Sequence, residues 1–176
     1  VRQSLVSGLS VGGTHGTPYV GALAGDVQWL IVMNSNLENI TVSGAYAGGL
    51  AGSVGDNDYG DWHVEGVTLS GSNSVTGTVV AGGLLGYGHF SSGGSEGDKS
   101  VEFRDLLVDV NVSGGSVVGG LAGRVTNTNY GSVTPIATNI VFNGNVTASV
   151  ASMTSEAKVG GLFGDVVLDN SSGNGS

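Results

Sequence analysis

The sequence has no cysteine and no long apolar run. The absence of cysteine excludes a disulfide framework, a reactive thiol and a thiolate metal site, so no redox chemistry is expected. The longest purely apolar run is WLIVM at residues 29–33. This run is far shorter than the roughly 20 residues that a membrane-spanning helix requires, so the sequence predicts no membrane span.

Basic residues are scarce: Lys and Arg number 5, against 14 Asp and Glu, for a formal net charge of −9. Such a charge repels phosphate backbones and excludes nucleic acid as an expected partner. Charged residues make up only 11% of the chain, about half the usual share. Gly, Ser, Thr, Asn and Val dominate instead. This composition, together with a start at Val1 that is typical of a processed chain, predicts an extracellular or cell-surface location.

One glycine-rich hexapeptide recurs five times along the chain. The copies are VGALAG (20–25), AGGLAG (47–52), AGGLLG (81–86), VGGLAG (118–123) and VGGLFG (159–164). Their last glycines are separated by 27, 34, 37 and 41 residues. Repeats with a period of about 20 to 50 residues are typical of solenoids, propellers and arrays.

A segment with strand-like alternation precedes each later copy, as in NLENITVSG at residues 36–44. Its apolar residues Leu37, Ile40 and Val42 alternate with polar ones, which is typical of half-buried strands. The frequent glycines make long helices costly. We therefore predict an all-β fold, a parallel β-solenoid of about five GGLxG rungs. A β-sandwich is the alternative, because short strands with glycine turns also build that fold.

The hexapeptide has a physical interpretation as the tight inner corner of each rung. Its leucine is expected to point inward, and its glycines to allow close approach of neighbouring backbone. The predicted structural residues are Gly21, Leu23, Gly25, Gly48, Gly49, Leu50, Gly52, Gly82, Gly83, Leu84, Gly86, Gly119, Gly120, Leu121, Gly123, Gly160, Gly161, Leu162 and Gly164.

The G-G-L-x-G motif, preceded by a short N-x-x-V-x-G strand, resembles the GLUG repeat of bacterial surface and secreted proteins. The resemblance covers Val20 to Gly164, and the first copy departs from it at Ala22, where the second glycine is expected. It implies a surface-exposed, adhesin-like β-solenoid without a catalytic constellation of its own.

The sequence suggests three segments and an assembly. Residues 1–19 are predicted to form an N-terminal strand that serves as a cap or polymerisation segment, and residues 20–168 the solenoid. Residues 169–176, rich in Ser, Gly and Asn, have the composition of a flexible tail. Because a solenoid exposes a strand edge at each end, we expect self-association into a fibre or a longer solenoid.

The leading functional hypothesis is a non-enzymatic extracellular structural protein, a surface filament subunit or an adhesin stalk. No cofactor is expected. A third-ranked alternative is a polysaccharide-degrading enzyme, since such enzymes place carboxylates in a groove. The densest acidic group holds Asp56, Asp58 and Asp61. These carboxylates are also the candidate ligands for calcium, which takes oxygen donors.

Aromatic residues after the hexapeptides support the second-ranked alternative, a module that binds carbohydrate or a host surface through edge loops. The candidate ligand or interface residues are Trp29, Tyr59, Trp62, Tyr87, Phe90 and Tyr130. Three N-x-S/T sequons, at Asn39, Asn111 and Asn145, lie in segments whose alternation turns the Asn outward. They are candidate glycosylation sites.

Overall fold

The computed structural model describes residues 1–16, 18–56, 62–90, 99–127, 133–149 and 156–168. In these segments the chain forms twenty strands and no helix. Every strand pair with an assigned register is parallel. The prediction of an all-β fold with parallel sheets is therefore confirmed. The described strands do not form the antiparallel sheets of a β-sandwich.

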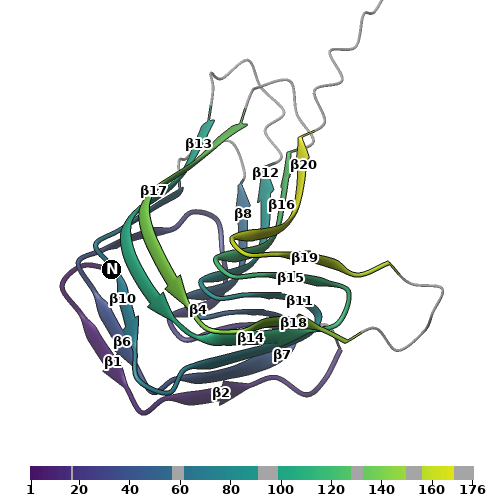
Figure 1. Cartoon of the computed structure of the whole chain (residues 1–176), viewed down its shortest axis with the longest axis horizontal. Helices are drawn as coiled ribbons and strands as arrows, with labels where there is room; N and C mark the ends of the chain where they lie inside the picture. Colours follow the sequence, from purple (N-terminus) through teal and green to yellow (C-terminus); the bar gives the residue numbers. More distant parts are fainter. Residues whose placement is uncertain (17, 57–61, 91–98, 128–132, 150–155, 169–176) are drawn as a thin grey trace, which may run out of the picture.

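The strands are arranged in three sheets (Figure 1). The first sheet contains β1 (Leu5–Ser7), β5 (Ile31–Met33), β6 (Asn36–Glu38), β9 (Trp62–Glu65), β10 (Thr68–Ser70), β13 (Lys99–Asp109) and β17 (Val133–Asn143). The second contains β2 (Ser10–Gly12), β3 (Tyr19–Gly21), β7 (Thr41–Gly48), β11 (Ser74–Gly82), β14 (Asn111–Gly114), β15 (Val117–Gly119), β18 (Val146–Ala148) and β19 (Lys158–Gly160). The third contains β4 (Ala24–Val27), β8 (Ala51–Asp56), β12 (Leu85–Phe90), β16 (Ala122–Asn127) and β20 (Phe163–Leu168).

Each repeat contributes strands to all three sheets. In the fourth repeat the chain passes along β13 in the first sheet, β14 and β15 in the second, and β16 in the third (Figure 1). Along these strands the alternate apolar side chains, such as Phe103, Val112 and Val125, are buried. The core therefore lies between the sheets, because strand alternation turns one side chain in two toward it.

Equivalent residues of successive repeats lie beside one another. The first glycine of each hexapeptide lies beside the first glycine of the next one, in the order Gly21, Gly48, Gly82, Gly119 and Gly160. Each motif leucine from the first to the fourth copy donates its N–H to the carbonyl of the next motif leucine, at 2.8 to 2.9 Å. The five hexapeptides thus form one continuous hydrogen-bonded column.

The first residues of the chain belong to the same sheets. β1 pairs with β6, and β2 pairs with β7, both in parallel. Residues 5–12 therefore extend the sheets that the later repeats continue, and the predicted boundary at residue 19 does not coincide with a change of sheet.

A second column of tight corners was not anticipated from the sequence. One residue per repeat has a left-handed backbone at the same place in the first sheet, with φ between 48° and 61°. These residues are Gln3, Asn34, Gly66, Asp105 and Asn139. Asn, Asp and Gly tolerate this conformation best, which explains four of the five residue types.

Candidate functional site: the corner row

The residues that flank each hexapeptide form two facing columns, which we call the corner row; Ser53, Val80 and Val117 in these columns are buried. One column precedes the hexapeptides and the other follows them. The first is Tyr19, Tyr46, Val80, Val117 and Lys158. The second is Asp26, Ser53, Tyr87, Arg124 and Asp165. The hexapeptide turns the chain back, so that Lys158 and Asp165, on opposite sides of one copy, form an ion pair at 3.0 Å.

Aromatic side chains occupy the part of the row formed by the first three repeats. The ring centroids of Tyr19 and Tyr46 are 4.9 Å apart, and those of Tyr46 and Tyr87 are 5.8 Å apart. His89, two residues further along β12, has its ring nearly parallel to that of Tyr87 at 6.1 Å. The four rings therefore form a continuous aromatic surface across three repeats.

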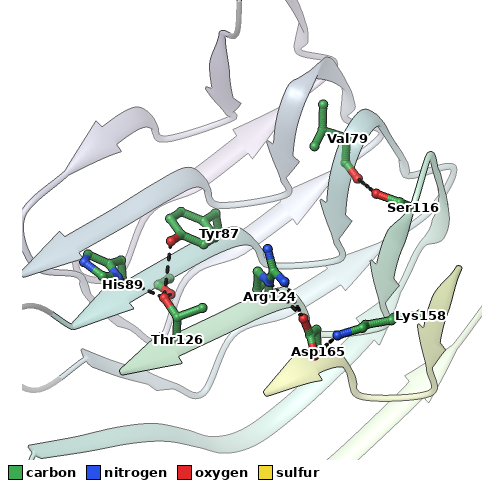
Figure 2. Close-up of polar contacts among 9 residues, drawn as sticks. Val79, Tyr87, His89, Ser116, Arg124, Thr126, Lys158 and Asp165 are labelled. Atoms are coloured by element: carbon green, nitrogen blue, oxygen red, sulfur yellow. Dashed lines mark hydrogen bonds and ion pairs between the residues drawn. The ribbon is translucent and has the colours of Figure 1, made fainter. Parts of the chain in front are cut away.

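Hydrogen bonds hold the Tyr87 and His89 rings toward the fourth repeat (Figure 2). The Thr126 hydroxyl lies 3.2 Å from the Tyr87 hydroxyl and 2.9 Å from His89 Nδ1. At the other end Tyr19 keeps 39% of its surface exposed. Partial burial of its hydroxyl, together with the neighbouring Tyr46 and Asp26, raises the pKa of Tyr19, so its phenol stays neutral at ordinary pH.

Charged side chains occupy the part of the row formed by the last two repeats (Figure 2). Arg124 contacts Asp165 Oδ2 through Nε at 2.9 Å and Nη2 at 2.8 Å, and Lys158 Nζ donates to Oδ1 at 3.0 Å. Burial of the Asp165 carboxyl favours its neutral form, but the hydrogen bonds from Lys158 and Arg124 outweigh this effect and lower its pKa. The carboxylate thus ties β19 and β16 to β20.

Acidification is expected to weaken this attachment. The Asp165 contribution to the free energy of unfolding is complete above the usual Asp pKa of about 3.9. It is lost as the pH falls through the lower folded-state value. Thermal unfolding measured from about pH 6 to about pH 2 should show a smaller pH dependence in Asp165→Asn than in the unsubstituted protein. The control is Asp26→Asn, at the equivalent exposed position of the first repeat. If its curve changes as much as that of Asp165→Asn, the interpretation is wrong.

A separate polar cluster lies on the outer face of the first sheet. His63 Nε2 is 2.7 Å from a Glu65 oxygen, and His63 Nδ1 is 3.1 Å from a Glu102 oxygen. Arg104 Nε donates to the same Glu102 oxygen at 3.1 Å. This hydrogen bond lowers the pKa of the Glu102 carboxyl despite the opposing effect of burial, and His63 lowers it further. Both carboxylates therefore lie within hydrogen-bonding distance of the His63 ring.

Metal and cavity candidates are few in the part of the chain that the structure describes. No group of three His, Asp or Glu side chains there has an arrangement that could hold a metal ion. The calcium candidates Asp58 and Asp61 lie outside the described residues, and for Asp56 only the backbone, at the end of β8, is described. Val27, Gln28 and Trp29 line a surface cavity of about 290 Å³.

The predicted aromatic residues have different environments. Trp29 is 55% exposed, and Tyr87 lies in the corner row. Trp62 is completely buried, which corrects the prediction that it lies on an exposed edge. It begins β9, where strand alternation turns its side chain into the core. Tyr59 and Tyr130 lie outside the described residues, as does the side chain of Phe90.

The three sequon asparagines, Asn39, Asn111 and Asn145, all have exposed side chains. The Oδ1 atom of Asn39 accepts a hydrogen bond from Ser72 N at 3.0 Å, and that of Asn111 accepts one from Asn145 N at 3.1 Å. Asn145 Nδ2 also donates to Asn111 Oδ1 at 3.2 Å. All three side chains therefore link neighbouring repeats, and glycosylation stays a prediction.

Sequence reasoning missed most of the corner row. Tyr87 is the one row residue among the sequence-predicted candidates, because most of the others lie further beyond each hexapeptide. The signal was present in the residues immediately next to the motif, where Tyr19, Tyr46, Arg124, Lys158 and Asp165 are aromatic or charged.

No helix formed by the described residues is long and apolar enough to cross a membrane. A scan against protein-family models, a search of curated proteins and a search of solved structures found no match to the chain. The resemblance to GLUG repeats therefore stays a prediction.

Proposed function

We propose that the chain is a parallel β-solenoid that acts as an extracellular structural module, a surface filament subunit or adhesin stalk, whose copies stack end to end. The in-register parallel pairing of equivalent residues in five repeats supports a solenoid. The composition, poor in charge and free of cysteine, supports an extracellular setting.

The observation that carries the proposal is the exposure of the last repeat. Val159, Leu162 and Val166 are 50%, 37% and 38% exposed. Their partners in the fourth repeat, Val118, Leu121 and Val125, are completely buried. Each of the edge strands β18, β19 and β20 pairs with one described strand only. Exposed apolar side chains beside an unpaired backbone edge favour the addition of another strand layer.

A second copy fits this end because its first repeat carries VGALAG, a close variant of the VGGLFG hexapeptide in the last repeat. If the register continues, Val159, Leu162 and Val166 of one copy lie beside Val20, Leu23 and Val27 of the next. Charge also matches: the Arg124, Lys158 and Asp165 group has a net positive charge, and Asp26 at the other end is negative. The new contact would repeat the one between successive repeats inside the chain.

Disulfide cross-linking tests the register. In the outer column Leu5, Asn36, Thr68, Leu107 and Val141 are aligned neighbours. Head-to-tail stacking places Val141 beside Leu5 of the next copy at about 4.8 Å, within the range for a disulfide. Because the chain has no cysteine, the variant Leu5→Cys with Val141→Cys has only the two introduced thiols. It should give a ladder of covalent oligomers under oxidising conditions.

The matched control combines Leu5→Cys with Leu107→Cys, because Leu107 lies on the same outer column one repeat inside the end. It should give no ladder. A ladder of equal strength from the control, or monomers alone in light scattering and electron microscopy of the concentrated protein, would contradict end-to-end stacking.

A further inference from the structure

The corner row extends along the direction in which the repeats stack. Its ends are Tyr19 and Asp26 in the first repeat, and Lys158 and Asp165 in the fifth. With about 4.8 Å between parallel strands, the row is roughly 19 Å long. Because each repeat contributes one residue to each column, the row is a narrow strip rather than a compact patch, which favours an extended ligand.

The aromatic half of the corner row, which consists of Tyr19, Tyr46 and Tyr87, has features that simple packing does not require. In the column of Tyr19 and Tyr46, the third and fourth repeats have Val80 and Val117 instead. These two valines are only 2% and 6% exposed. Tyr19, Tyr46 and Tyr87 are all less buried than these valines and carry hydroxyl groups. Such rings offer an apolar surface with a polar edge at a small cost in side-chain entropy. The C–H faces and hydroxyl groups of a sugar ring match both properties.

The charged half of the row, which consists of Arg124, Lys158 and Asp165, offers hydrogen-bond donors that ion pairs hold in place. An arginine has five N–H donors and a lysine three, whereas the single Asp165 carboxylate engages only part of those of Arg124 and Lys158. The side chains of Arg124 and Lys158 are 37% and 44% exposed. Because Asp165 holds both cations, their remaining donors can bond to hydroxyl groups at a smaller ordering cost than those of unpaired side chains.

Charge selects the class of ligand. The chain has a net charge of −9, and within the row Asp26 and Asp165 balance Arg124 and Lys158, so the row offers a polyanionic glycan or a nucleic acid no excess of positive charge. We propose that the corner row binds a neutral, linear, β-linked oligosaccharide. Its sugar rings lie against Tyr19, Tyr46 and Tyr87, and its hydroxyl groups accept hydrogen bonds from Arg124 and Lys158.

Titration calorimetry on the full chain tests this site. The probes are cello-, xylo- and manno-oligosaccharides from disaccharide to hexasaccharide. At least one series should bind, with an affinity that rises with length until the row is filled. Tyr46→Ala, at the centre of the aromatic half, should weaken binding about tenfold, the loss of one good ring contact. Tyr46→Phe, which keeps the ring, should retain most of the affinity.

Leu107→Ala is the matched control, an exposed side chain on the outer face of the first sheet. It should bind as the unsubstituted protein does. Thermal unfolding identifies the folded variants, so a purely structural role of Tyr46 would appear as a lower melting temperature with unchanged affinity. That outcome, binding of anionic glycans alone, or no binding of any neutral series at millimolar concentration would overturn the proposal.

Discussion

Gly82→Ala is expected to prevent the chain from reaching its native structure. A Cβ atom at Gly82 would collide with the carbonyl oxygen of Leu85 and lie 2.5 Å from the backbone nitrogen of Gly123 in the next repeat. Both obstacles are backbone atoms of the hydrogen-bonded hexapeptide column, so neither can move alone. The expected loss exceeds about 4 kcal/mol, a large part of the 5 to 15 kcal/mol that stabilises a typical domain.

Gly161→Ala provides the matched control for this substitution. Gly161 belongs to the same motif in the last repeat, but a Cβ atom there meets nothing within 4 Å, and its φ is not in the left-handed region. Denaturant unfolding monitored by circular dichroism should show a cooperative transition for Gly161→Ala and none, or a greatly weakened one, for Gly82→Ala. Similar midpoints for the two variants would show that the hexapeptide column is not closely packed.

Asn73→Ala is expected to destabilise the fold by about 3 kcal/mol. Asn73 is buried, and its side chain joins three repeats. Its Oδ1 accepts from Ile40 N at 2.9 Å, and its Nδ2 donates to Ser70 O at 2.9 Å and Asp109 O at 2.8 Å. Alanine leaves the buried N–H of Ile40 without this acceptor and removes a donor from two carbonyls. Each such group costs about 1 to 3 kcal/mol.

Two further substitutions separate these contributions. Asn73→Asp keeps an acceptor for Ile40 N but places a buried carboxylate oxygen against Ser70 O and Asp109 O, so its loss at neutral pH should be at least as large as that of Asn73→Ala. Asn36→Ala, at an exposed position of β6, should change the free energy of unfolding by no more than about 0.5 kcal/mol. Equal losses for Asn36→Ala and Asn73→Ala would refute the bridging role of Asn73.

Local signals in the sequence were sufficient for the fold class. Alternation around Leu37, Ile40 and Val42 predicts strands, and these three side chains are buried. The recurrence of one motif predicts that like elements lie side by side, and the parallel register of Gly48 with Gly82 agrees with this. Both properties depend only on neighbouring residues, which is why a single sequence reveals them.

The candidate sites depended on contacts that the sequence does not display. His63 and Glu102, like Tyr87 and Thr126, are 39 residues apart, and the spacing between hexapeptides varies from 27 to 41 residues. With such unequal spacing, no fixed period identifies which side chains become neighbours. Trp62 shows the same limit, because one position along a strand separates an exposed side chain from a buried one.

The sequence by itself determined that the chain forms strands and glycine turns. Its short apolar runs and its net negative charge predict no membrane-spanning helix and no polyanionic partner. These conclusions follow from composition, alternation and charge, which are properties of the chain before it folds. Only the tertiary structure decided that the residues on either side of each hexapeptide meet in the corner row, and that the last repeat exposes Leu162. The physical reason is that register between repeats is set by backbone hydrogen bonds between distant segments, and this register selects the side chains that come into contact.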